Sequence, residues 1–212
     1  MSTRDGMKSE IKRKSLHLTG LVIPVLYYII GRELTLTFIA LAFFVFVVLE
    51  PFRIIEELRD RIKRRLRIYV DEDIFERMEE LERRIDEITR EHERYRVAAH
   101  IYFAAASFTV VYFFPREIAV GAISVATVGD ALAAIVGKSL GRHRFSNGKS
   151  LEGSLAYFLS GLAILWPLVG LPLAVVGSLA GTLAEFYNLP PDDNFSNQIS
   201  VALTVYLVGA LF

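Results

Sequence analysis

The chain has 212 residues, no cysteine and a formal charge of zero, and 53% of its residues are apolar. This length suits one or two domains, and the absence of cysteine excludes disulfides and thiolate chemistry. Charge gathers in residues 1–15, 52–96 and 138–152, whereas the rest of the sequence is almost continuously apolar. This division argues against an ordinary soluble protein.

Seven apolar segments are candidates for crossing a lipid bilayer. A helix needs roughly 20 apolar residues to span the hydrocarbon core, and fewer if its ends snorkel or the membrane is thin. A small soluble domain built from seven such segments would have far more core than surface. We therefore predict an all-α, polytopic membrane bundle with about seven transmembrane helices, at residues 16–30, 34–50, 97–114, 117–137, 151–169, 171–187 and 196–212.

The distribution of lysine and arginine predicts how these helices are oriented. With a cytoplasmic N-terminus, the polar segments 1–15, 52–96, 138–150 and 188–195 all lie on the cytoplasmic side. The short turns on the opposite side carry only Arg32 and Arg116. No small-residue cleavage site follows the first apolar segment, so a removable signal peptide is not expected. We predict a multi-pass protein whose N-terminus and active site are cytoplasmic.

Residues 52–96 alternate basic with acidic side chains and carry two apolar stripes at helical spacing. One stripe runs from Ile54 to Leu66 and the other from Ile74 to Ile88, with a break near residues 69–73 where an aspartate can cap the second helix. We predict a cytoplasmic amphipathic helical hairpin here. A spacer or dimer contact is the simpler interpretation, and a substrate lid is the alternative.

The chain therefore divides into three predicted parts. Residues 1–50 hold the basic segment and the first two transmembrane helices, residues 51–96 hold the hairpin, and residues 97–212 form a five-helix transmembrane catalytic core. Gly177 and Gly181 form a GxxxG pattern in this core, and Gly129, Ala133 and Gly137 repeat at the same spacing. We expect these small residues to permit close helix packing.

Asp130 is an acidic residue inside an apolar helix. It lies seven residues before Gly137, about 10 Å from the cytoplasmic end at 1.5 Å per residue. An ionised aspartate within the bilayer costs roughly 2.5–3.5 kcal/mol, so we expect it to face the bundle beside a cation. A buried helix–helix hydrogen bond is the alternative. The loop that follows is expected to supply the cation, from Lys138, Arg142, His143, Arg144 or Lys149.

Three glycines, Gly137, Gly141 and Gly148, punctuate this basic loop. Glycine lets backbone amides approach an anion closely, which is typical of phosphate nests. A basic topology signal without a ligand is the alternative. A nucleotide-binding P-loop is excluded, because the pattern ending at Gly148 needs a glycine where His143 stands, and no strand precedes it.

The segment 185–197 returns to the same side with a second group of oxygen ligands. Magnesium prefers one or two carboxylates together with phosphate oxygens and water. An ordinary acidic turn is the alternative, but the basic loop and the acidic turn together predict a phosphate–metal clamp. Glu185 is placed to join it, and the predicted metal ligands are Asp130, Asp192 and Asp193.

Arg13 and Lys14 precede the first apolar segment, and His17 follows them closely. The two cations either anchor the topology or reach a triphosphate, since they lie on the same side as the loop. His17 and His100 lack metal-ligand spacing with other histidines, so we expect them to be interfacial or packed, with His17 the more suggestive.

Together these elements resemble the membrane family that contains dolichol kinase, phytol and other polyprenol kinases, and the CTP-dependent diacylglycerol kinase. The resemblance runs from about residue 10 to the end, apart from most of 52–88. The matching elements are Arg13-Lys14-x-x-His17, Gly129-Asp130-Ala131-x-Ala133-x-x-x-Gly137-x-x-x-Gly141, Gly148-Lys149-Ser150-Leu151-Glu152-Gly153-Ser154, and Glu185 with Asp192-Asp193-Asn194.

The resemblance implies transfer of the γ-phosphate of CTP to the hydroxyl of a lipid alcohol, with Mg²⁺ or another divalent cation. A polyprenol, dolichol or geranylgeraniol acceptor is favoured over diacylglycerol. The implied partners are CTP, the lipid alcohol and the bilayer; no nucleic acid is expected, and a homodimer stays open. The implied catalytic residues are Asp130, Glu152 and Glu185, and the implied nucleotide-binding residues are Arg13, Lys14, Gly137, Lys138, Gly141, Arg142, Lys149, Ser150 and Gly153.

Two other functions stay open at this point. A cytidylyltransferase would use the same nucleotide to make a CDP-lipid and pyrophosphate. A lipid transporter or flippase would use Asp130 in an intramembrane relay, but transport predicts polar residues spread through several spans, whereas here they gather on one face.

Overall fold

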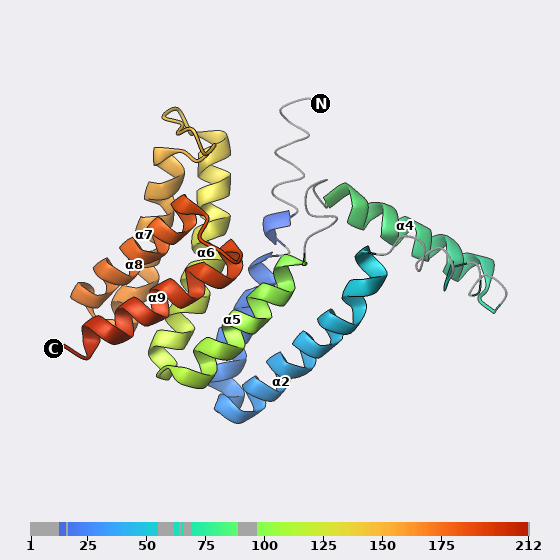
Figure 1. The fold of residues 1–212 in the computed structure, drawn as a ribbon, viewed down its shortest axis with the longest axis horizontal. Coiled ribbons are helices and arrows are strands. Elements are labelled where there is room, and N and C mark those ends of the chain that lie inside the picture. The colour runs from blue at the N-terminus through green and yellow to red at the C-terminus, as the bar shows by residue number, and fades with distance from the viewer. Residues whose placement is uncertain are drawn as a thin grey trace.

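The computed structural model describes residues 13–15, 17–54, 62–63, 65, 69–88 and 97–211. Across these residues every regular element is a helix, which confirms the predicted all-α class. The helices are shown in Figure 1. In chain order they are η1 (Leu18–Leu21), α2 (Val22–Ile54), α4 (Glu72–Ile88), α5 (Ala99–Phe113), α6 (Arg116–Ser139), α7 (Leu151–Val169), α8 (Leu171–Tyr187) and α9 (Asp193–Gly209).

The first long helix, α2, is bent into two arms (Figure 1). The break falls at Gly31, whose φ of 78° lies in the left-handed region that favours glycine. Residues 16–30 and 34–50 were predicted as separate spans on either side of a turn, and the break lies between them. Glycine at this position therefore explains how one continuous apolar stretch reverses direction.

Among the described residues, three helices are long and apolar enough to cross a membrane by length and composition: Arg13–Pro51, Arg116–Ser139 and Leu151–Val169. The apolar helices α5 and α8 are shorter. On α7 the exposed side chains include Leu151, Leu155 and Leu159, which recur every fourth residue along one face. An exposed leucine row is the reverse of what a helix in water presents. These features support a membrane protein, and the number of seven spans stays a prediction.

Helix α6 is the axis of the bundle. It contacts η1, α2, α5, α7, α8 and α9, and most of its central residues are buried. Small residues make this possible, because a Cβ on Gly121 would lie 2.6 Å from Leu165, and one on Gly129 would lie 3.0 Å from the ring of Tyr157. The chain therefore surrounds α6 with helices, and a polar group on it is shielded from lipid.

The GxxxG pattern of α8 packs against α9, as predicted. A Cβ on Gly177 would come within 2.5 Å of Val205, and one on Gly181 within 2.7 Å of Val201. Such distances are shorter than real side chains allow, so only glycine lets the two helices approach this closely. This contact brings the end of α8 beside the start of α9.

One end of the bundle, where α5 passes into α6, carries Arg32 and Arg116. Arg116 lies over the ring of Tyr28 at 5.2 Å and Arg32 over that of Tyr112 at 5.8 Å. Arg32 also donates to the carbonyl of Val111 at 3.1 Å. Arginine stacked on tyrosine is typical of the membrane–water boundary, where both side chains keep a polar tip in water.

Helix α4 is set apart from the bundle (Figure 1). In the described part of the chain it contacts none of the other helices. It confirms the second helix of the predicted hairpin over residues 72–88, while most of the first predicted helix lies outside the described residues, as do residues 1–12. Because Ile74, Met78 and Leu81 are exposed on one side of it, α4 carries an apolar face that the bundle does not use.

Candidate functional site

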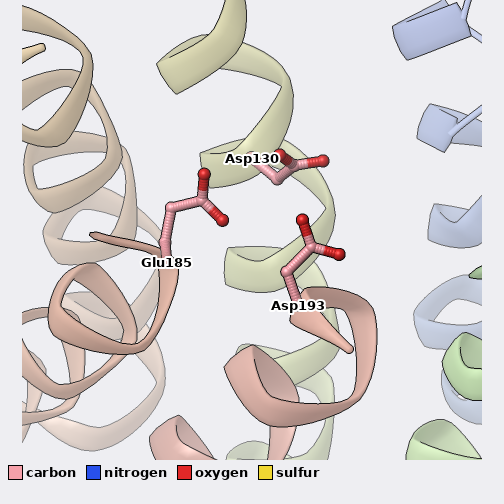
Figure 2. A group of neighbouring side chains, drawn as sticks. All are labelled: Asp130, Glu185 and Asp193. Carbon is pink, nitrogen blue, oxygen red and sulfur yellow. The ribbon is translucent and has the colours of Figure 1, made fainter. Parts of the chain in front are cut away.

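Three carboxylates come together where α6, α8 and α9 meet (Figure 2). They belong to Asp130, Glu185 and Asp193, and one oxygen from each lies within 4.8 Å of the other two. Asp130 and Glu185 are buried, and Asp193 is partly buried. We call these three residues the carboxylate cluster. The sequence singled out each of them, and the fold places them in one site.

The ends of α8 and α9 explain how two of these side chains reach the third. Helix α8 stops at Asn188, which adopts a left-handed conformation with φ of 47°. Asp192 then caps α9, because its side chain accepts a hydrogen bond from the backbone amide of Asn194 at 2.9 Å. Glu185 therefore lies in the last turn of α8 and Asp193 in the first turn of α9, both facing the buried middle of α6.

Two lysines balance part of the charge of the cluster. The Lys14 ammonium forms an ion pair and hydrogen bond with Asp130, and the Lys149 ammonium does the same with Glu185. Lys14 is itself buried, with only 5% of its surface exposed. The His17 ring also lies close, with Nε2 3.4 Å from Oδ2 of Asp130. Buried charges of this kind persist only when they are paired.

The source of the cation beside Asp130 corrects the sequence prediction. We expected the loop after α6 to supply it, whereas Lys14, more than a hundred residues earlier in the chain, does so. The loop lysine, Lys149, pairs with Glu185 instead. The reason is geometric: the loop lies beyond the end of α6, while Asp130 faces the N-terminal segment that packs against the middle of this helix.

Asp193 completes the cluster without a cation of its own in the described part of the chain. Its Oδ1 accepts a hydrogen bond from Nδ2 of Asn194 at 3.0 Å. Burial, together with the charges of Asp130, Glu185 and Asp192, raises the pKa of Asp193 to about 7. A bound cation would offset this repulsion and favour the ionised form of Asp193.

Gly137 and Gly141, at the end of α6 and in the basic loop, pack against the start of α7. A Cβ on Gly137 would lie 3.0 Å from Oγ of Ser150, and one on Gly141 would lie 2.9 Å from the same atom. Gly153 is equally confined, with the carbonyl of Ala133 at 2.8 Å from its Cβ position. Ser150 caps α7 by accepting from the amide of Gly153 at 3.1 Å. These residues hold α6 against α7, so glycine here has a packing role that the predicted phosphate nest did not include.

Several polar groups of the loop are bonded within the loop or to α8. Glu152 accepts from the backbone amide of His143 at 3.2 Å and lies 2.8 Å from Nδ1 of the same residue. Asn147 fastens the loop to α8 by donating to the carbonyl of Phe186 at 2.8 Å. Glu152, one of the three predicted catalytic carboxylates, is thus engaged with the loop, whereas Asp130 and Glu185 share the cluster.

The remaining predicted residues lie around the cluster rather than in it. Asp192, a predicted metal ligand, has its Oδ1 bound by the amide and side chain of Asn194. Lys138 is exposed in the last turn of α6, Arg142 is exposed in the loop after it, and Arg13 is partly buried. Lys14 and Lys149 contact cluster carboxylates directly.

Two buried residues at the site were not predicted from the sequence. Asn197 donates from Nδ2 to Oε2 of Glu185 at 3.1 Å, and the ring of Tyr157 lies against Gly129 and Gly181. Each belongs to a helix that was predicted as an apolar membrane span. Sequence spacing could have identified Asn197, because it follows Asp193 by four residues, which places both on one face of α9.

Comparison with known proteins leaves the activity open. No family model matches the chain, and no solved structure matches it significantly. The chain is similar to uncharacterized protein RP860 of Rickettsia prowazekii (strain Madrid E), with 24% identity over 213 residues that cover 96% of each chain. The similarity extends over nearly the whole length, so it includes the segment that contains α4.

Proposed function

We propose that this protein is a membrane phosphotransferase that moves the γ-phosphate of CTP to the hydroxyl of a lipid alcohol, with a divalent cation. The observation that carries the proposal is the carboxylate cluster with Lys14 and Lys149 at its sides. Phosphoryl transfer depends mainly on positioning and on neutralising charge, and clustered carboxylates, a cation and lysines are the groups that it requires. CTP and the lipid alcohol come from the family resemblance.

Carboxylate oxygens are the ligands that a hard divalent cation prefers. Mg²⁺ binds oxygen at about 2.0–2.1 Å in octahedral geometry, so neighbouring ligands lie about 2.9 Å apart and opposite ligands about 4.2 Å apart. The three cluster oxygens lie within 4.8 Å of one another, so binding of Mg²⁺ would draw them closer together. A bound cation would neutralise charge on the phosphate oxygens.

The chain's own residues then have distinct roles in the transfer. Lys14 and Lys149 lie beside the carboxylates, where their ammonium groups can also hold phosphate oxygens. The acceptor oxygen forms the new bond to the γ-phosphorus while the bond to the CDP oxygen breaks. The hydroxyl proton passes to a carboxylate oxygen of the cluster, and the products are CDP and a lipid phosphate monoester.

The proposal includes the membrane arrangement predicted from the sequence. In it the seven apolar segments cross the bilayer, with α2 contributing two spans, and the cluster faces the cytoplasmic leaflet. Support comes from the basic residues, because Lys14 and Lys149 lie at the site and Arg32 and Arg116 lie at the other end of the bundle. The exposed leucine row of α7 and similar faces would contact lipid, so an acceptor lipid can approach sideways.

The test is a transfer assay with purified protein in nanodiscs. γ-Labelled CTP, ATP or GTP is added with Mg²⁺ and one lipid alcohol at a time: a polyprenol, geranylgeraniol or diacylglycerol. We expect label in a lipid phosphate monoester, with CDP released in equal amount, and loss of transfer in Asp130→Asn. The absence of label in every lipid would refute the proposal. Formation of CDP-lipid and pyrophosphate from a phosphorylated lipid would indicate a cytidylyltransferase instead.

A further inference from the structure

Asn197 is a buried amide that touches the carboxylate cluster with only half of its hydrogen-bonding groups. It lies one turn after Asp193 on α9, and 1% of its surface is exposed. Its Nδ2 donates to Oε2 of Glu185 at 3.1 Å, whereas its Oδ1 is buried and has no hydrogen-bond partner among the described residues. Leaving a buried carbonyl oxygen without a partner costs about 1–3 kcal/mol. Such an atom next to a carboxylate cluster calls for an explanation.

The orientation of this amide follows from the chemistry of its neighbour. An ionised carboxylate only accepts hydrogen bonds, so the NH₂ group of Asn197, and not its oxygen, faces Oε2 of Glu185. The side chain is therefore held at the cluster by Glu185, while its oxygen is bound by no group in the described part of the chain.

The neighbouring residue shows that the fold can satisfy buried amides in α9. Gln198 is fully buried, and its Oε1 accepts from Ser107 at 2.9 Å while its Nε2 donates to the carbonyls of Asn194 and Phe103. A buried amide with a purely structural role is thus fully bonded, and Asn197 is not. This contrast points to a ligand for its oxygen.

Tyr157 gives an independent sign that the site is built for a ligand. Its side chain is completely buried, and its hydroxyl has no hydrogen-bond partner in the described chain. The ring lies against Gly129 and Gly181, which are one residue before Asp130 and one turn before Glu185. Two polar atoms beside the same carboxylates are therefore buried without protein partners, although buried polar groups are almost always bonded.

We propose that Asn197 Oδ1 is the fourth protein ligand of a divalent cation held by Asp130, Glu185 and Asp193. This inference rests on the proposed function and assigns one further residue to its metal site. An amide oxygen is a hard ligand without charge, so it adds to the coordination shell without increasing the repulsion among three carboxylates. The NH₂ group meanwhile fixes Glu185, as outer hydrogen bonds commonly do for metal ligands.

The experiment measures Mn²⁺ binding to the full chain by electron paramagnetic resonance, in nanodiscs of zwitterionic lipid and without nucleotide. We expect Asn197→Ala to raise the Kd for Mn²⁺ by about ten-fold or more. Asn197→Asp keeps an oxygen at the same distance and loses the NH₂ donor, so its Kd should be equal to or lower than that of the unmodified protein. Gln198→Met, the matched control, removes the adjacent buried amide and should change the Kd by no more than about two-fold.

The outcomes separate this inference from the proposed function. A Kd for Asn197→Ala within two-fold of the unmodified protein would overturn the ligand assignment, and so would an Asn197→Asp variant that binds as weakly as Asn197→Ala, since the amide would then act only by holding Glu185. Either result leaves the kinase proposal standing. No Mn²⁺ binding by the unmodified protein would remove the metal site from both. If Asn197→Ala does not fold, as judged by gel filtration, Asn197→Asp decides the question.

Discussion

The carboxylate cluster and the glycine-rich basic loop are both rich in polar residues, but they use them in opposite ways. Within the loop, Glu152 binds His143, Ser150 caps α7, and Gly137 and Gly141 pack against that serine. The cluster draws its groups from distant parts of the chain, and Lys14 reaches Asp130 from the N-terminal segment. Within the described residues, it also leaves Asn197 Oδ1 and the Tyr157 hydroxyl without partners.

This difference shows that a motif with the residue spacing of a phosphate-binding loop does not by itself form a binding site. Hydrogen-bonding groups that the protein satisfies internally are unavailable to a ligand, whereas buried groups that it leaves unsatisfied need one. By this criterion the chemistry belongs to the cluster, and the loop supports it by delivering Lys149 to Glu185.

The largest expected effect is on the transfer rate, and it should distinguish Asp130 from Asp192, two aspartates of the predicted metal site. Asp130→Asn should lower the transfer rate by a factor on the order of 10²–10⁴, because it removes a charge from the centre of the cluster. Asp192→Asn should keep near-normal activity and stability, since Asp192 caps α9 and asparagine caps helices equally well. Initial rates with labelled CTP and a saturating lipid alcohol provide the measurement. Equal losses in both variants would contradict the assignment of Asp192 outside the cluster.

The ion pair between Lys14 and Asp130 gives the largest expected effect on stability. Lys14→Met leaves a buried aspartate without its cation, which should lower the free energy of unfolding by about 3–5 kcal/mol. The double variant Lys14→Met/Asp130→Leu replaces the pair with apolar side chains of similar size, so it should recover most of that stability while staying inactive. Unfolding followed by circular dichroism in detergent tests both. A double variant as unstable as the single one would show that the pair is not the cause.

The sequence predicted features that depend on local sequence better than features that depend on which helices pack together. Apolar length and charge distribution predicted a helical membrane protein, the turn near Gly31 and the close packing of Gly177 and Gly181, because each depends on local sequence alone. Asp130, Glu185 and Asp193 were recognised because carboxylates beside apolar helices stand out. The partners of these carboxylates were harder to predict. The pairing of Lys14 with Asp130 depends on which helices pack together, and spacing along the chain does not indicate this.

Gly153, in the first turn of α7, and Gly148, in the loop, distinguish packing from backbone conformation. Gly153→Ala should lower the free energy of unfolding by about 1–3 kcal/mol, because the new methyl group meets the Ala133 carbonyl at 2.8 Å and two helices must separate. Gly148 has a φ of +80° and open space around it, so Gly148→Ala should cost only about 1–2 kcal/mol of backbone strain. Activity should fall in Gly153→Ala, where α6 shifts, and persist in Gly148→Ala. A phosphate nest that uses the amide of residue 148 would reverse this order.

The smallest expected effect tests whether the loop supplies a catalytic base. Glu152→Gln keeps an acceptor for the amide and ring of His143, so the transfer rate should change by about two-fold at most. Glu185→Gln, the same chemical change inside the cluster, should lower the rate far more, on the order of 10²-fold or beyond. The two variants differ only in where the carboxylate lies, and they are compared at the same CTP, Mg²⁺ and lipid concentrations. If Glu152→Gln were as inactive as Glu185→Gln, the loop would take part in the chemistry, and its closed hydrogen bonds would have to open during turnover.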